Sequence, residues 1–180
     1  MALSATVYNL TVEVTDVDRN VYVGLDLRMA REPSESADYF VMRLLAYCLE
    51  YGGGISFTQG VAAGDDPAVW IHDLTGRLLA WIDVGLPGAD HLHRGSRAAE
   101  RAAVYTHRDA EQLVGQLSGR KIYRAEEIPV SALDPRFVAA VAERIERRAT
   151  LAITRSDGEL FVDIAGETFR CAMIEHRLHQ

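Results

Sequence analysis

The chain has 180 residues, of which 48% are hydrophobic and 25% charged, and its formal net charge is −7. This length is typical of one domain with a sizeable core, so we expect a single domain over residues 1–180. The acidic balance argues against non-specific nucleic-acid binding, which requires many Lys and Arg side chains to neutralise phosphates. Lys121 is the sole lysine, so any function that needs a lysine has one candidate.

Membrane and disulfide signals are weak throughout the sequence. The opening MALSATVYNLTVEV alternates apolar and polar residues, which predicts a strand rather than a signal peptide. No apolar run approaches the roughly 18 residues of a membrane-spanning helix, so we expect no membrane partner. Two cysteines, Cys48 and Cys171, do not make a disulfide framework. A cytoplasmic, reducing setting is expected.

Hydrophobic periodicity and turn residues predict alternating strands and helices. Expected strands, in chain order, cover Ala5–Val17, Val21–Ala30, Ile55–Thr58, both halves of Asp65–Pro87, Ala102–Thr106, Lys121–Arg124, Pro129–Leu133, Thr150–Arg155, Leu160–Ile164 and Glu167–Ile174. Expected helices begin at Ser34, as cap, and run to about Tyr51, then cover Ala89–Arg101, Asp109–Leu117 and Asp134–Arg148. We expect an α/β fold with a central mixed β-sheet flanked by helices, and β-hairpins at the N- and C-terminal ends.

The stretch Asp65–Pro87 predicts a hairpin with a tight turn over Asp73–Gly76, because Asp is favoured at the first turn position and Gly at the fourth. Pairing outward from this turn sets His72 near Arg77 and Trp70 near Leu79 or Ala80.

The same pairing brings Asp66 close to Asp83. A register slip of one or two residues makes Asp65 an equal contender for the first acid. Two carboxylates that converge from neighbouring strands are a common way to hold Mg²⁺. The alternative is that Asp65 and Asp66 form a solvated loop and that Asp83 lies on the surface.

Other candidate residues have competing structural interpretations. Glu35 in the first helical turn suits the helix dipole, or adds a third carboxylate to the site. Arg43 lies among apolar neighbours and is expected to form a salt bridge. His91 and His93 are two residues apart on a predicted helix, so they point to different sides and do not favour a shared zinc.

Several stretches together resemble the bacterial YaeQ family over nearly the whole chain. They are MALSATVY, REPSESADYFVMRLLAY, FTQG, DDPAVW, WIDVGLP and the RGS at Arg94–Ser96. The resemblance implies the restriction-endonuclease-like, or PD-(D/E)XK, architecture. It assigns the first acid to Asp66 or Asp65 and the second to Asp83, and it makes Glu35 similar to the helix carboxylate of many such nucleases.

The chain departs from that superfamily motif at Gly85, where a lysine is expected two residues after the second acid. The resemblance implies that the basic residue has moved to the following helix, where relatives carry a Lys at the position of Arg94. Arg94 can stabilise a pentavalent phosphate but stays protonated and cannot act as a base. Ser96 matches a small polar position in the same stretch.

Two functions follow from the resemblance. The first is a Mg²⁺-dependent phosphodiesterase acting on DNA or RNA, with Asp66 (or Asp65) and Asp83 as metal ligands and a bound water as nucleophile. The second is a catalytically degenerate binding or regulatory protein on the same fold, linked to transcription elongation or DNA maintenance. The second is favoured by Gly85 and by the single lysine.

Overall fold

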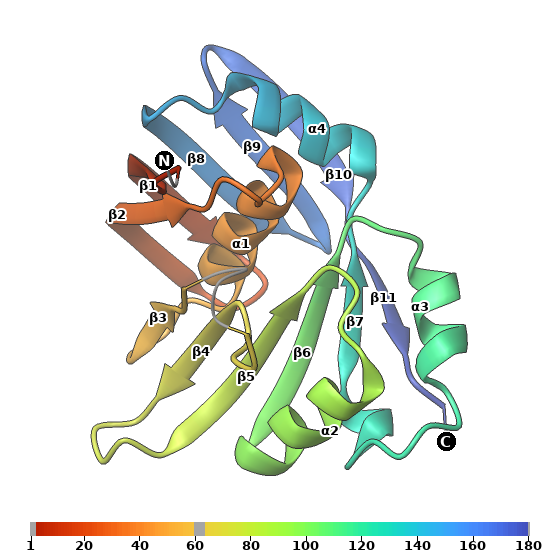
Figure 1. Ribbon diagram of the computed structural model, residues 1–180. Coiled ribbons are helices and arrows are strands. Elements are labelled where there is room, and N and C mark those ends of the chain that lie inside the picture. The colour runs from red at the N-terminus through yellow and green to blue at the C-terminus, as the bar shows by residue number, and fades with distance from the viewer. Residues whose placement is uncertain (1–2, 60–63, 180) are drawn as a thin grey trace.

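The computed structural model describes residues 3–59 and 64–179 of the chain (Figure 1). Its helices are α1 (Ala37–Leu49), α2 (Ala89–Ala98), α3 (Ala110–Leu117) and α4 (Pro135–Arg144), with a short 3₁₀ turn, η2 (Ala125–Glu127). Its strands are β1 (Thr6–Asp16), β2 (Val21–Arg31), β3 (Ile55–Phe57), β4 (Val69–His72), β5 (Leu78–Val84), β6 (Arg101–Thr106), β7 (Pro129–Ala132), β8 (Arg148–Ser156), β9 (Glu159–Ile164), β10 (Glu167–Ala172) and β11 (Ile174–Arg177).

The strands form two mixed sheets rather than one central sheet with hairpins at its ends. The five-stranded sheet has the order β10-β9-β8-β1-β2, in which β1 and β8 run parallel. The six-stranded sheet has the order β11-β7-β6-β5-β4-β3, in which β5, β6 and β7 run parallel. The α/β class is confirmed, but the predicted terminal hairpins join each other in a sheet of their own. Local hydrophobic periodicity cannot predict this pairing, because β1 and β8 are far apart in the sequence.

The two tight turns of the C-terminal strands lie at Asp157-Gly158 and at Ala165-Gly166. Asp157 and Gly158 have φ of 52° and 73°, and Ala165 and Gly166 have φ of 53° and 76°. Two consecutive residues with positive φ are typical of the two-residue turns that suit the right-handed twist of a hairpin. These turns join β8 to β9 and β9 to β10.

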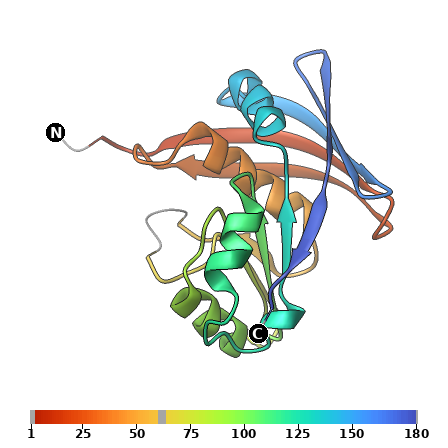
Figure 2. The same ribbon diagram turned by 90° about the vertical axis from the view of Figure 1, so that its right-hand side faces the viewer.

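The main core joins the two sheets through α1 and α4. It contains Leu10 and Val12 of β1, Ile82 of β5 and Ile153 of β8, together with most of α1. Helix α1 is buried on nearly all sides, which is why its sequence is apolar around the whole circumference. In Figure 2, α1 and α4 lie on the same side of the five-stranded sheet.

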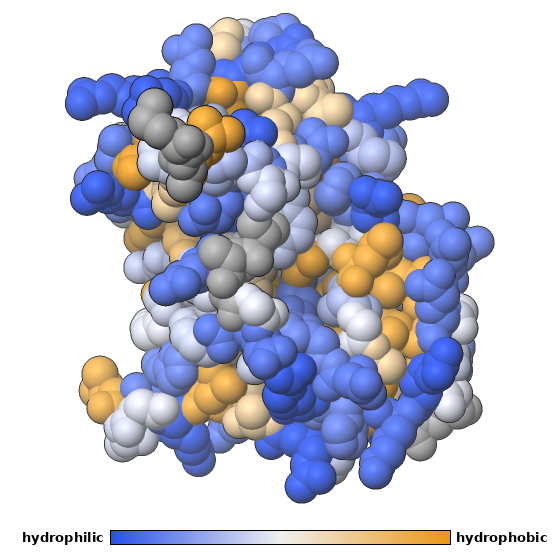
Figure 3. Space-filling view, viewed as in Figure 1, coloured by the Kyte–Doolittle hydropathy of each residue, from blue (hydrophilic) through white to orange (hydrophobic). Residues whose placement is uncertain are grey.

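A second, smaller core lies on the other face of the six-stranded sheet. Alternate residues of a strand point to opposite faces, so Ala80 and Ile82 enter the main core while Trp81 points away from it. Trp81 packs with Leu92 of α2 and Leu113 of α3. Polar residues cover most of the surface in Figure 3, and the apolar residues there form only small patches.

Several predicted boundaries were wrong. Residues Lys121–Arg124 form no strand but a loop that leads into η2. Helix α4 ends at Arg144, and Arg148 already belongs to β8. The run Glu167–Ile174 breaks at Met173 into β10 and β11, which join different sheets.

The start of α1 also differs from the prediction. The helix begins at Ala37, and its cap is Ser36, whose Oγ accepts a hydrogen bond from the Tyr39 amide at 3.1 Å. Ser34 therefore does not cap the helix. Glu35 precedes α1 instead of lying in its first turn, so the dipole interpretation of Glu35 does not apply.

Candidate functional site

A pocket of about 300 Å³ opens at the C-terminal end of β5. Its lining residues come from α1, from the segment before β4, from the end of β5 and from α2: Tyr39, Gly64, Asp66, Ala68, Asp83, Val84, Leu86, Pro87 and His91. Asp66 and Asp83, the two acids predicted to meet, both line it.

Asp83 is buried, with 4% of its surface exposed, and both of its oxygens have protein partners. Oδ2 accepts a hydrogen bond from the indole Nε1 of Trp81 at 2.8 Å. Oδ1 lies 2.8 Å from Nε2 of His91. An ionised carboxylate only accepts hydrogen bonds, so the His91 nitrogen that faces it carries a proton. Trp81, His91 and the strand together fix the orientation of the carboxylate.

His91 is the pocket residue that sequence reasoning missed. Its ring packs edge-on against Trp81, with centroids 5.1 Å apart. His93 faces a different neighbour, because its Nδ1 accepts a hydrogen bond from the Tyr123 amide at 3.1 Å. The two histidines therefore diverge as their spacing predicts. One sequence signal could have indicated the contact between His91 and Asp83. His91 lies near the start of a predicted helix, and that helix directly follows the strand that carries Asp83.

The hydrogen bond to Asp83 raises the pKa of His91 above its usual value, and this effect outweighs burial, which lowers the pKa. Protonation of His91 is thus more favourable in the folded chain than in the unfolded chain. Its stabilising contribution is fully present below the unfolded pKa of about 6.5 and is lost as the pH rises through the higher folded pKa.

We therefore predict that His91→Gln destabilises the metal-free protein more below pH 6 than above pH 8, values that bracket the usual histidine pKa of about 6.5. Urea unfolding of both proteins across this range measures the difference. A difference that grows with rising pH would contradict the assignment. As a control, Asp83→Asn should bring the His91 pKa, followed by NMR, back toward its ordinary value.

The register of the hairpin is not the predicted one. The turn forms as expected, with the Gly76 amide donating to the Asp73 carbonyl at 3.0 Å. A bulge between Ile71 and His72 then shifts the pairing, so that Trp70 lies opposite Trp81 rather than Leu79 or Ala80, and His72 lies opposite Leu78 rather than Arg77. Asp66 lies before β4 begins, and it lines the pocket from that loop.

Asp65 and Arg94 form an ion pair on the surface near the pocket. Nη1 of Arg94 lies 3.0 Å from Oδ1 of Asp65, and the two side chains are 49% and 83% exposed. Both charges influence the pKa of His91, which places them near the site without lining it. Of the two contenders for the first acid, Asp66 is the one in the pocket.

Glu35 has a different environment from the one predicted for a third carboxylate. It is 2% exposed, and Arg43 binds it through Nε to Oε1 at 2.7 Å and Nη2 to Oε2 at 3.0 Å. The salt bridge predicted for Arg43 is thus confirmed, and Glu35 is its partner. Tyr39, which lines the pocket, is influenced by both acids: burial raises its pKa, Arg43 lowers it, and the charges of Asp83 and Glu35 raise it further.

Ser96 does not reach the pocket either. It is 2% exposed, and its hydroxyl donates to the His93 carbonyl of the same helix at 3.1 Å. Its environment is that of a helical core residue, and the position matters for packing.

Gly85, where the resemblance implies a lysine, has a backbone conformation that favours glycine. Its φ is +87°, and its amide donates to the Tyr105 carbonyl at 2.9 Å. A side chain at this φ costs about 1–2 kcal/mol, so Gly is favoured by backbone conformation. Space is not the constraint, because an added Cβ would lie 3.5 Å from the Tyr39 ring. Lys121 does not replace the missing group, because it lines a separate pocket with His93 and Tyr123.

Gly95 of α2 leaves room for the indole ring of Trp81, which in turn donates a hydrogen bond to Asp83. A Cβ at position 95 would lie 2.4 Å from the indole ring of Trp81, closer than any real contact. We predict that Gly95→Ala costs about 1–3 kcal/mol of unfolding free energy, since the indole must move. Gly115→Ala in α3 is the matched control, because nothing lies within 4 Å there and Ala favours the helix. Equal effects of the two substitutions in urea unfolding would refute the packing role.

The two pocket acids are the candidate ligands for a metal ion. Within residues 3–59 and 64–179 no group of three or more His, Cys, Asp or Glu side chains could hold a metal. Mg²⁺ nevertheless binds through one or two carboxylates and keeps several waters. Each oxygen of Asp83 accepts one hydrogen bond and retains a lone pair, and Asp66 lines the same pocket. Two carboxylates in one pocket are oxygen ligands of the kind that Mg²⁺ takes, and they do not make the four-ligand set of a closed zinc site.

Comparison with known proteins decides the family. The family model described as "YaeQ protein" matches residues 1–173. The chain belongs to the YaeQ family. It is 32% identical to the uncharacterized protein YaeQ of Escherichia coli K12 over 163 residues, which cover 90% of each chain. The Salmonella typhi YaeQ is 31% identical over 166 residues, 92% of each chain.

Solved YaeQ structures share the fold. The crystal structure of YaeQ from Pseudomonas syringae matches with a TM-score of 0.85 and 28% identity, over 95% of each chain. That of YaeQ from Xanthomonas axonopodis pv. citri matches with a TM-score of 0.85 and 24% identity, over 97% of this chain and 99% of that one. The two mixed sheets and the helices packed on them are therefore the fold of the YaeQ family. None of the helices in the described part of this YaeQ chain is long and apolar enough to cross a membrane.

Proposed function

We propose that this YaeQ-family chain is a divergent PD-(D/E)XK protein that hydrolyses phosphodiester bonds of DNA or RNA with Mg²⁺. The observation that carries the proposal is that Asp66 and Asp83 line one pocket. A mixed sheet with Asp83 on a hairpin strand and Asp66 in the loop just before that hairpin supports the superfamily assignment. The free, buried thiols of Cys48 and Cys171 support the proposed cytoplasmic setting.

In this proposal Asp66 and Asp83 would hold Mg²⁺, which when bound would activate a water molecule and offset charge on the phosphate. Asp83 has little freedom to reorient, because Trp81 and His91 fix both oxygens. Arg94, half exposed beside the pocket, stabilises the negative charge that develops on the phosphate. Glu35 supports α1 from its ion pair with Arg43 and takes no part in the chemistry.

The second candidate function is a catalytically degenerate binding or regulatory protein, linked to transcription elongation or DNA maintenance. A specific observation favours it: no lysine can take the motif position without strain, since φ of Gly85 is +87°. This candidate keeps nucleic-acid binding and loses hydrolysis.

An assay of single-stranded DNA, duplex DNA and RNA with Mg²⁺ and with Mn²⁺ separates the two functions. The proposal expects metal-dependent cleavage of at least one substrate, abolished by EDTA. Binding without cleavage of any substrate would favour the degenerate protein. Cleavage that persists in EDTA would overturn the metal-dependent mechanism.

A further inference from the structure

The five-stranded sheet has one face packed against α1 and α4 and one face that is exposed. Along β1, the buried residues Leu10 and Val12 alternate with exposed Asn9, Thr11 and Glu13. Charged residues are distributed unevenly over the exposed face. Arginines gather at one end of it, in a chain whose net charge is −7.

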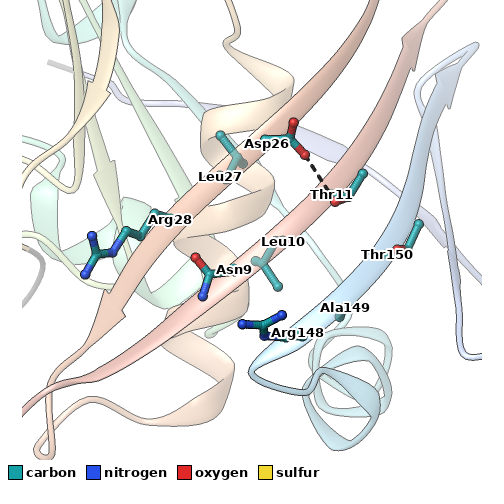
Figure 4. Close-up of a pocket in the computed structure, with 9 residues that line it drawn as sticks. All are labelled: Asn9, Leu10, Thr11, Asp26, Leu27, Arg28, Arg148, Ala149 and Thr150. Atoms are coloured by element: carbon teal, nitrogen blue, oxygen red, sulfur yellow. Dashed lines mark hydrogen bonds between the residues drawn. The ribbon is translucent and has the colours of Figure 1, made fainter.

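Three residues form a row across three neighbouring strands of this face. Asn9 of β1 lies opposite Arg28 of β2 on one side and opposite Arg148 of β8 on the other. Figure 4 shows the three side chains in this order. Neighbouring strands are about 4.8 Å apart, so the Cα atoms of the two arginines are separated by roughly 10 Å. In Figure 4 the side chain of Arg148 extends toward Asn9, whereas that of Arg28 extends outward from β2.

The row lines two adjoining hollows. One, of about 550 Å³, contains Thr11, Thr150 and Asp26 beside the row. The other, of about 530 Å³, adds Arg147, and both contain Asn9, Arg28 and Arg148. We call these residues the arginine row: Asn9, Arg28 and Arg148, which line both hollows, and Arg147, which lines the second.

The guanidinium groups of the arginine row have no counter-charge of their own. Among residues 3–59 and 64–179, Arg28, Arg147 and Arg148 form no side-chain hydrogen bond or ion pair, whereas Arg43, Arg101, Arg144 and Arg155 each pair with an acid. The nearest acid of the hollow, Asp26, already accepts a hydrogen bond from Thr11 at 3.2 Å. Gathering three unpaired like charges costs stability unless an anion joins them.

We infer that the arginine row docks the phosphate backbone of a nucleic acid. Arginine forks, a side-chain amide and threonine hydroxyls are the groups that contact phosphate and sugar in protein–nucleic acid complexes. The choice of nucleic acid over another polyanion rests on the proposed function. The surface itself lies on the five-stranded sheet and contains none of the pocket residues.

The test measures the anisotropy of a fluorescein-labelled single-stranded oligonucleotide against salt concentration, in EDTA, with wild type and Arg28→Gln/Arg148→Gln. We expect the double variant to bind roughly tenfold more weakly. Two lost phosphate contacts should also reduce the slope of log K against log salt by about 1.4. Arg120→Gln/Arg136→Gln is the matched control, since it removes two exposed arginines outside the row.

Unchanged affinity in the Arg28/Arg148 variant, or an equal loss in the control, would overturn the inference. Stronger binding of a polyglutamate peptide than of the oligonucleotide would overturn the choice of nucleic acid. Failure of the proposed function has a different signature. If wild type binds through the row but cleaves nothing with Mg²⁺, the docking surface stands and the hydrolase proposal falls. If wild type cleaves a substrate and the Arg28→Gln/Arg148→Gln variant binds normally, the hydrolase proposal stands and the docking surface falls.

Discussion

Replacing Arg43 by Ala should cost about 3–5 kcal/mol of unfolding free energy, more than any surface substitution in this chain. The change leaves the carboxylate of Glu35 buried without its cation. It also removes a donor from the Ala30 carbonyl and a guanidinium that lies 5.5 Å from the Phe40 ring centroid. Because α1 packs against both sheets, the loss should appear as lower stability of the whole fold.

Urea unfolding with a two-state fit measures this cost. Arg94→Ala is the matched control, because its pair with Asp65 is exposed and should contribute less than about 1 kcal/mol. The double variant Glu35→Met/Arg43→Met should lose less than Arg43→Ala, since no charge is left unpaired. If Arg43→Ala and Arg94→Ala cost the same, the buried pair has no special role.

Asp83→Asn should lower the rate of metal-dependent cleavage at least roughly a hundredfold. The amide has nearly the shape of the carboxylate but loses the charge, and with it the attraction for Mg²⁺. Single-turnover cleavage with saturating enzyme isolates this effect from substrate binding.

Asp65→Asn is the control for that experiment, since it removes a carboxylate near the pocket that is paired with Arg94 on the surface. We expect it to retain most of the activity. Equal losses in the two variants would mean that general negative charge, rather than the geometry at Asp83, is responsible. Full activity in Asp83→Asn would remove the site from the mechanism.

Local signals predicted much of the fold. The turn residues at Asp73–Gly76 and Asp157–Gly158 determine their own conformation, so their positions were predictable. The division into two sheets was not, because it depends on pairing between β1 and β8, whose sequences give no sign of each other. The break of the predicted strand Glu167–Ile174 at Met173 was not predictable either, because it depends on the pairing of β10 and β11 with different sheets.

The candidate site was predicted only in part, because local sequence does not show which side chains will meet across elements. Alternation along β5 shows that Asp83 shares a face with Trp81, but not that an indole N–H will bind it. The bulge at Ile71 and His72 leaves no mark in the apolar pattern, so the register was wrong. Glu35 and Arg43 lie eight residues apart with a helix start between them. That spacing leaves their pairing open until the path of the chain from β2 into α1 is known.

The central claim is that Asp66 and Asp83 bind one divalent cation between them. Calorimetric titration of Mn²⁺ into the purified protein tests it most directly, with wild type, Asp66→Asn, Asp83→Asn and the Asp65→Asn control. The account predicts one bound ion in wild type and in Asp65→Asn, with binding lost or at least roughly tenfold weaker in the other two variants. No binding in wild type, or binding unchanged by both pocket substitutions, would contradict it.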